Sequence, residues 1–143
     1  MIRILFVCHG NICRSPMAEF MMKEYVRRAG RENDFIIESA ATSSEELGND
    51  MYPPAKQILR EKGIPFARRA ARKITANDYS RFDMIICMDE YNLRNLQRFY
   101  NGDPEGKAAM LLNRPISDPL YTDDFESTYK DLQEGCERLI KQL

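Results

Sequence analysis

A cysteine and an arginine frame a short segment near the N-terminus of the chain. Cys8 and Arg14 stand six positions apart, with Gly10 and Asn11 between them. A thiolate is a strong nucleophile, and a guanidinium can bind two phosphate oxygens at once. Glycine and asparagine tolerate the backbone angles that turn successive amides toward an anion. The segment therefore predicts a phosphate cradle above a sulfur nucleophile, and thiolate attack on phosphorus to give a cysteinyl-phosphate.

The sequence on either side of this segment indicates a strand before it and a helix after it. The run from Ile2 to Val7 is almost entirely apolar, as in a strand that is buried on both faces of a parallel sheet. Downstream, Ser15 is expected to cap a helix that begins at Pro16. Amides at a helix N-terminus and a nearby arginine favour the thiolate form of Cys8. Because the Cys-x5-Arg spacing also arises by chance, a loop cysteine with an incidental arginine is the competing interpretation.

The rest of the chain alternates strands with helices. Three further apolar runs predict strands at residues 35–37, 84–88 and 108–112. Helical spacing and capping residues predict further helices beginning near Pro53, Thr75, Asp89 and Phe125, the third with Leu93, Leu96 and Phe99 on its buried side. Loops are expected at 38–44 and 113–124. We expect an α/β fold with a single domain over residues 1–143, a doubly wound four-stranded parallel sheet with helices on both faces. Ligands of such sheets bind beyond the carboxyl ends of the strands, where the cysteine segment lies.

The composition is that of an ordinary soluble domain. Of 143 residues, 43% are hydrophobic and 30% are charged, and the formal net charge is −1. This balance creates no overall field for nucleic acid or a membrane, so neither is an expected partner. The basic residues Arg68, Arg69, Arg72 and Lys73 lack interleaved aromatics and are expected to be solvated or paired internally. With no secretory signal and four cysteines that read as free thiols, the cytoplasm is the expected location.

The segment from Cys8 to Glu19 closely resembles the signature of the low molecular weight protein tyrosine phosphatases. The resemblance continues in order along the chain, through residues 39–43, 72–75, 86–90, 92–93, 117–119 and 125–129. It implies phosphorylated protein or peptide substrates, inorganic phosphate as the product, and no metal or other cofactor. A monomer or weak dimer is expected.

By position, the resemblance implies a role for each residue of the site. Cys8 is the nucleophile and Arg14 is the phosphate clamp. Asp118 is the general acid, which protonates the leaving phenolate and then, as a base, activates water. Asp103 also precedes a proline, so the local sequence alone does not distinguish it from Asp118 as the general acid. The phosphate-binding loop comprises His9, Gly10, Asn11, Ile12, Cys13, Arg14 and Ser15.

The family pattern also implies a network that supports this loop. Hydrogen bonds of Asn11, Ser15 and Ser39 are expected to hold the loop in shape, although ordinary turn and cap chemistry also accounts for these residue types. Where the pattern has a supporting histidine after the second helix, this chain has Arg69. His9, the only histidine, is adjacent to the nucleophile but is not expected to be catalytic.

The expected pocket rim departs from the family pattern. Glu45, followed by Glu46, stands where an aromatic residue is common, and Leu120 and Tyr121 follow the Asp-Pro pair where two tyrosines are common. These changes weaken the stacking surface for a phosphotyrosine ring. A protein-arginine phosphatase of similar sequence is therefore an alternative, although the pattern of that branch has threonine where this chain has Ile12.

The remaining cysteines raise further alternatives. The resemblance implies a reversible disulfide between Cys13 and Cys8, and plain packing of Cys13 is the competing account. Cys87 and Cys136 are expected in the core, which counts against an arsenate reductase of the same fold, since that enzyme needs exchangeable thiols. A phosphate-binding or thiol redox-sensing module without turnover also remains open, as does a metal site at Cys8, His9 and Cys13, which lacks a second ligand pair.

Overall fold

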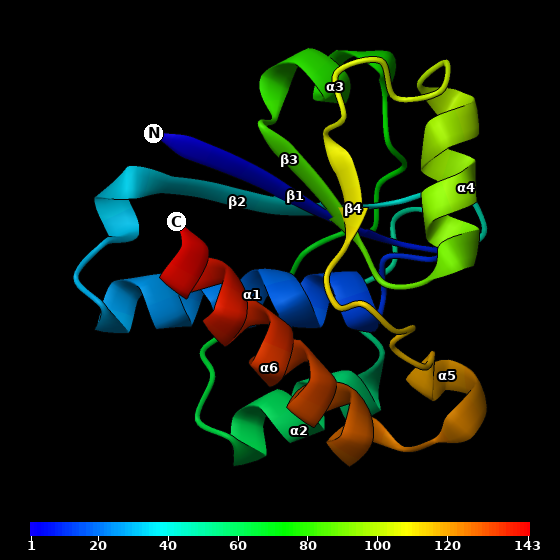
Figure 1. Cartoon of the computed structure of the whole chain (residues 1–143). Coiled ribbons are helices and arrows are strands. Elements are labelled where there is room, and N and C mark those ends of the chain that lie inside the picture. Colours follow the sequence, from blue (N-terminus) through cyan, green and yellow to red (C-terminus); the bar gives the residue numbers. More distant parts are fainter.

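All four strands of the protein run parallel in one sheet (Figure 1). The computed structural model describes residues 1–143. Its strands are β1 (Ile2–Cys8), β2 (Phe35–Ala41), β3 (Met84–Cys87) and β4 (Ala108–Met110). They lie in the order β2-β1-β3-β4, so the apolar strand β1 is central in the sheet, where helices can cover both of its faces.

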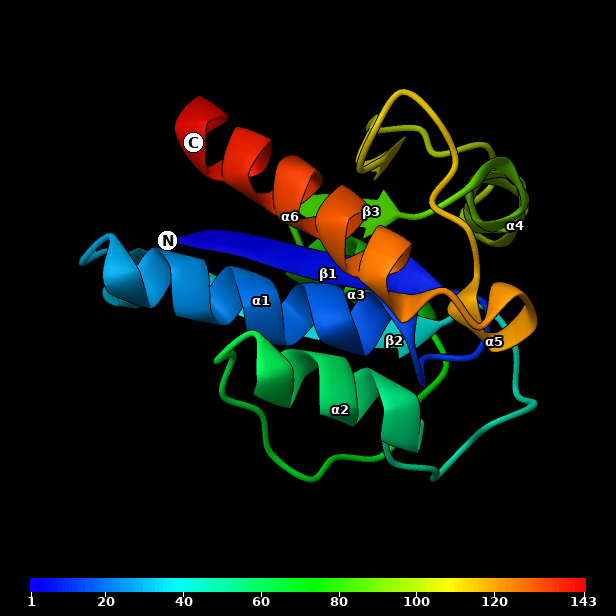
Figure 2. The same ribbon diagram turned by 90° about the horizontal axis from the view of Figure 1, so that it is seen from below.

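Helices cover both faces of the sheet (Figures 1 and 2). One face carries α1 (Arg14–Arg28), α2 (Pro53–Glu61) and α6 (Phe125–Gln142), and the other carries α3 (Ala76–Arg81) and α4 (Glu90–Phe99). Side chains of β1 alternate between these layers, with Ile4 and Phe6 in the first core and Leu5 and Val7 in the second. The predicted doubly wound α/β fold is therefore confirmed. None of the helices combines the length and apolar character of a bilayer span.

Several element boundaries differ from the sequence prediction. β2 continues through residues 38–41, which the sequence predicts as loop, because these residues pair with residues 5–8 of β1. β4 ends at Met110, two residues before its predicted end. Within the predicted loop 113–124, Pro119–Thr122 form the short helix α5. Between α1 and β2, Glu32–Asp34 form a 3₁₀ turn. On α4, Leu96 is buried but Phe99 is 42% exposed, so the predicted apolar side is shorter than its sequence pattern indicates.

The caps of the helices show where local chemistry decides a boundary. Asp89 caps α4 as predicted and accepts a hydrogen bond from Asn92 N at 2.8 Å. Thr75 forms the predicted capping box at the start of α3. Ser15, however, is not a cap, since α1 begins at Arg14 and Cys13 is the N-cap residue. The Ser15 hydroxyl is buried and instead contacts Asn11 within the loop and the Ala40 carbonyl of β2, which a local capping rule does not register.

The parallel strands bring the loops at their carboxyl ends to one end of the sheet. The loop from β1 to α1, the start of α4 after β3, and α5 after β4 all lie on the right of Figure 1. This end of the sheet holds the residues that the sequence predicts as functional.

Candidate active site

Cys8 is the last residue of β1, and its sulfur is surrounded by hydrogen-bonding groups. Only 3% of the residue is exposed. The Asn11 amide donates to Cys8 Sγ at 3.3 Å, and Ser15 Oγ lies 3.0 Å from the same sulfur. Donors at these positions stabilise a negative sulfur, because a thiolate is a far better acceptor than a thiol. The geometry therefore suits Cys8 to act as a nucleophile.

Asn11 fixes the shape of the loop between β1 and α1. Its φ of 59° is in the left-handed region, which asparagine tolerates at small cost. Its buried Nδ2 donates to Ser15 Oγ at 2.8 Å and to Ser39 Oγ at 3.0 Å. Its Oδ1 accepts from Arg72 N at 3.2 Å and from the Arg69 guanidinium. These four contacts use the full hydrogen-bonding capacity of the side-chain amide.

Gly10 does not adopt the left-handed backbone angle that the sequence allows it, and its role in the loop is a matter of space. Its φ is not in the left-handed region, so it is Asn11 and not Gly10 that uses the conformational freedom expected of both residues. A Cβ atom at Gly10 would lie 3.3 Å from Cγ of Glu46. The absence of a side chain therefore lets Glu46 lie directly against the loop.

Arg14 is held by groups from two other loops. Its Nη1 donates to Asp89 Oδ2 at 2.7 Å and to the Ile116 carbonyl at 2.8 Å, while its Nη2 lies 3.5 Å from Asp118 Oδ2. The residue is buried, and its Nε has no hydrogen-bond partner in the protein. Although burial opposes the charge, the neighbouring Cys8 and two carboxylates raise the pKa of Arg14 above its ordinary value. One edge of a charged guanidinium is thus free to bind an anion.

The two Asp-Pro candidates lie at opposite ends of the sheet. Asp118 precedes α5 and lines the same small pocket as Cys8 and Arg14. Asp103 lies before β4, where it accepts hydrogen bonds from the Tyr79 hydroxyl and from two backbone amides. Although burial opposes ionisation, these hydrogen bonds hold the pKa of Asp103 below its ordinary value. Asp103 therefore has a structural role, and the geometry leaves Asp118 as the candidate acid.

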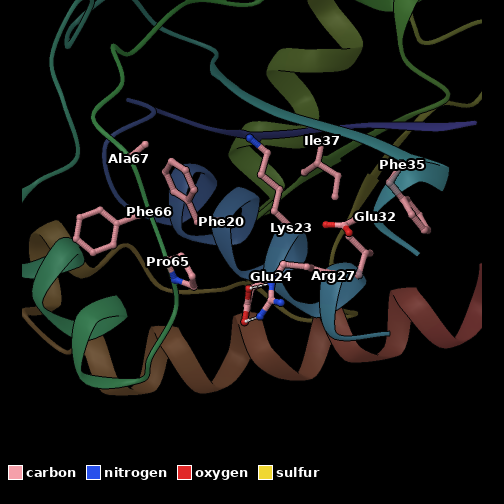
Figure 3. Close-up of a pocket in the computed structure, with 11 residues that line it drawn as sticks. Phe20, Lys23, Glu24, Arg27, Glu32, Phe35, Ile37, Pro65, Phe66 and Ala67 are labelled. Atoms are coloured by element: carbon pink, nitrogen blue, oxygen red, sulfur yellow. Dashed lines mark hydrogen bonds and ion pairs between the residues drawn. The ribbon is translucent and has the colours of Figure 1, made fainter. Parts of the chain in front are cut away.

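The pocket above the loop gathers the residues that the sequence predicts as its floor and rim. Its lining residues are Cys8, His9, Gly10, Ile12, Cys13, Arg14, Glu45, Glu46, Asp118, Leu120 and Tyr121. A much larger pocket of about 550 Å³ lies between α1, the start of β2 and residues 65–67 (Figure 3). It is lined by Phe20, Phe35 and Phe66 among others and contains no cysteine, so it offers no thiol nucleophile. No cluster of three or more potential ligand side chains in residues 1–143 is arranged to hold a metal ion.

Comparison with known proteins gives the family. A family model described as "Low molecular weight phosphotyrosine protein phosphatase" matches residues 3–143. The chain belongs to this family. The phosphatase chain is 34% identical to the low molecular weight protein-tyrosine-phosphatase YfkJ of Bacillus subtilis, over 100% of this chain and 96% of that protein.

Solved structures of the phosphatase family share the whole fold. The structure of SP-PTP, a low molecular weight protein tyrosine phosphatase from Streptococcus pyogenes, has a TM-score of 0.94 and 38% identity, over 100% of this chain and 93% of that one. The structure of DARP, a Drosophila arginine phosphatase, has a TM-score of 0.87 and 29% identity, over 99% of this chain and 97% of that one. Structures with this fold thus include a protein that is named for action on arginine instead of tyrosine.

The other cysteines of this phosphatase are buried, and none forms a disulfide. Cys87 and Cys136 have no exposed surface, and burial raises the pKa of each thiol to about 12. Burial and the neighbouring Cys8 raise the pKa of Cys13 well above its ordinary value. Cys87 and Cys136 therefore pack in the core and are not available for the thiol exchange that an arsenate reductase requires.

Arg69 contacts the loop of this phosphatase at the place where the family pattern has a histidine. Its Nη2 donates to the Asn11 carbonyl at 2.6 Å and also contacts Asn11 Oδ1. The neighbouring Arg72 pairs with Asp78 at 2.9 Å, so Arg72 is paired internally, as the sequence predicts, whereas Arg69 is held by neutral acceptors. No local sequence pattern predicts the contact of Arg69 with this loop, because 58 positions separate Arg69 from Asn11.

Replacing Arg69 with methionine is expected to destabilise the protein by about 1–3 kcal/mol, because two buried acceptors of Asn11 lose a charged donor. Urea unfolding of the variant measures this loss, and kcat for an aryl phosphate should fall in parallel. Arg68→Met is the matched control, since Arg68 is exposed and makes no hydrogen bond or ion pair. The control should change stability by less than about 0.5 kcal/mol. Equal losses in the two variants would contradict a specific role of Arg69.

Proposed function

We propose that the protein is a protein tyrosine phosphatase that hydrolyses aryl phosphates through a cysteinyl-phosphate on Cys8. The observation that carries this proposal is the single pocket in which Cys8 Sγ, the free edge of Arg14 and the carboxylate of Asp118 meet. Arg14 and the loop amides bind the phosphate oxygens, and the Cys8 thiolate attacks phosphorus as the bond to the phenolic oxygen breaks. Asp118 gives its proton to that oxygen.

The second half of the cycle reverses the role of the carboxyl group. The Asp118 carboxylate accepts a proton from water while the water oxygen attacks the phosphorus of the cysteinyl-phosphate. The sulfur–phosphorus bond breaks, which restores the thiolate and releases inorganic phosphate. Ser15 Oγ, 3.0 Å from Cys8 Sγ, and the Asn11 amide stabilise the departing sulfur.

Contacts at the rim favour an aryl phosphate over a phosphoarginine. Ile12, Leu120 and Tyr121 supply apolar surface at the pocket, and Leu120 and Tyr121 are 40% and 80% exposed. The acidic residues that would attract a guanidinium already have partners. Glu45 Oε2 lies 2.9 Å from His9 Nε2, and Glu46 Oε2 accepts from Asn49 Nδ2 at 2.6 Å. One oxygen of each carboxylate is therefore already engaged, so neither is free to form the two-oxygen contact that a guanidinium prefers.

Peptides of one sequence that carry either phosphotyrosine or phosphoarginine test this preference. With a metal chelator present, kcat/KM for phosphate release should be at least about tenfold higher for phosphotyrosine, because the apolar rim contacts its ring. Glu45 and Glu46 are the observation that favours the second candidate, a protein-arginine phosphatase. A higher kcat/KM on the phosphoarginine peptide would establish that candidate. If neither peptide were hydrolysed, a phosphate-binding or redox-sensing module would be the better description.

The same pocket supports a redox role for Cys13. Cys13 lines the pocket together with Cys8. We infer that a peroxide oxidises the Cys8 thiolate to a sulfenic acid, and that attack by the Cys13 thiol then expels water and forms a disulfide, which two equivalents of a small thiol reduce again. The four free cysteines are consistent with action in a reducing compartment, for which we propose the cytoplasm. We expect the protein to act there as a monomer or weak dimer.

A further inference from the structure

A groove leads from the catalytic pocket along α4. Two pockets of about 360 and 490 Å³ flank the catalytic pocket on this side. The nearer one shares Arg14 and Asp118 with the catalytic pocket, and the two flanking pockets share His9 and Asn95. In Figure 1, α4 begins near the loop that follows β1 and runs upward, away from α5. The groove is therefore continuous with the catalytic pocket and extends beyond it.

One stripe of α4 lines the groove. Tyr91, Asn95 and Arg98 follow one another at spacings of four and three residues, which places them on one face of the helix. Tyr91 and Asn95 line the nearer flanking pocket, and Asn95 and Arg98 line the farther one. Thr42 also lines the farther pocket, and its buried Oγ1 has no hydrogen-bond partner in the protein. The side-chain amide of Asn95 can bind the main chain of an extended peptide, whereas the Thr42 hydroxyl is covered by protein atoms.

The far end of the groove is basic. Arg98 is exposed and makes no ion pair or hydrogen bond within the protein. Lys73 is also exposed and makes no ion pair, and its Nζ lies 5.9 Å from the centre of the Phe99 ring. No carboxylate lines the farther pocket, whereas Asp89 and Asp118 line the nearer one and Glu45 and Glu46 line the catalytic pocket. An acidic segment is therefore attracted to the far end of the groove and repelled from the acidic part of the pocket rim.

We propose that this groove binds the substrate segment next to the phosphorylated residue and that Arg98 selects an acidic side chain there. The inference rests on the proposed function, because it concerns the substrate of that same site. Asp89, which contacts Arg14, and Arg98 are separated by the rise of nine helical residues, roughly 14 Å. An extended peptide covers this distance in about four residues. The acidic side chain thus belongs three or four residues from the phosphorylated residue.

Phosphotyrosine peptides with charge at these positions test the inference. Four peptides carry either glutamate or lysine at the third and fourth residues, before the phosphotyrosine in one pair and after it in the other. The readout is kcat/KM for each peptide divided by kcat/KM for para-nitrophenyl phosphate, which has no flanking residues. In one of the two pairs, the wild-type protein should give a higher ratio for the glutamate peptide than for the lysine peptide. Arg98→Glu should lower the ratio for that glutamate peptide roughly five- to tenfold. The lysine peptide of the same pair should gain in the variant.

A matched variant and salt separate the groove from a general charge effect. Arg68→Glu changes the net charge equally, but Arg68 is exposed and lines neither flanking pocket, so this variant should leave the ratio unchanged. The preference of the wild type should disappear at about 1 M salt, where the Debye length is about 3 Å. Equal effects of the two variants, or no preference in either peptide pair, would overturn the inference while leaving the proposed function intact. No turnover of any aryl phosphate would instead overturn the proposed function itself, and this inference with it.

Discussion

Replacing Cys8 with serine is expected to lower kcat for para-nitrophenyl phosphate by about 10⁴-fold or more. The loop supplies donors that stabilise a thiolate at this position, the Asn11 amide at 3.3 Å and Ser15 Oγ at 3.0 Å. A serine hydroxyl stays protonated in the same place and is a much weaker nucleophile. Steady-state release of para-nitrophenol, with a chelator present, measures the loss.

The serine variant also shows whether the loss is chemical. Arg14 and the loop amides are unchanged in Cys8→Ser, so inorganic phosphate should still raise its Tm, with a rise that follows the logarithm of phosphate concentration above Kd. Retention of that stabilisation together with loss of turnover identifies Cys8 as the nucleophile. Wild-type turnover in Cys8→Ser would instead rule out the cysteinyl-phosphate mechanism.

Replacing Asp118 with asparagine is expected to lower kcat for phenyl phosphate by about 10²- to 10⁴-fold. A phenol with a pKa near 10 leaves poorly as an anion, so its departure depends on the proton that asparagine cannot give. Asparagine keeps the cap of α5, in which Asp118 Oδ1 accepts from Leu120 N at 3.1 Å. The defect in kcat/KM, which reports the first half of the cycle, should shrink for aryl phosphates whose phenols are more acidic. Rates measured across a series of substituted phenyl phosphates give this dependence.

Asp103→Asn is the matched control for this prediction. Asp103 accepts hydrogen bonds from Tyr79 and from two amides near the start of β4, so its replacement should lower stability by about 1–3 kcal/mol. Turnover per folded molecule should stay near the wild-type value. A crippled Asp103→Asn beside an unimpaired Asp118→Asn would transfer the acid role to Asp103 and leave the nucleophile unaffected.

The contrast between these two aspartates shows what the sequence could predict. The apolar run of β1 and the alternation of elements were enough to predict the parallel sheet, because both follow from burial and periodicity. Asp103 and Asp118 have the same local sequence chemistry, and only their resemblance to the family distinguished them. In the structure, the direction of β4 separates them, since one precedes this strand and the other follows it.

Residues that act through long-range contacts were beyond local prediction. The Ser-Pro pair is a good helix start, yet the Ser15 hydroxyl does not cap α1 and lies 3.4 Å from the Ala40 carbonyl, 25 positions away. Arg69 reaches Asn11 across 58 positions. The Ile116 carbonyl, which binds Arg14, is a backbone group that any residue could supply. Such contacts depend on how the elements pack, which no capping or spacing rule encodes.

The anchoring of Arg14 by Asp89 and the Ile116 carbonyl also affects the entropy of binding. An arginine that is free to rotate loses up to about 2 kcal/mol of rotamer entropy when a ligand fixes it. Here that freedom is already lost when α1 docks against the start of α4 and the segment before α5. A phosphate group entering the pocket meets an immobile guanidinium, and its binding free energy is not reduced by ordering that side chain. The entropic penalty of organising the clamp thus falls on the folding reaction and is not repeated in each catalytic cycle.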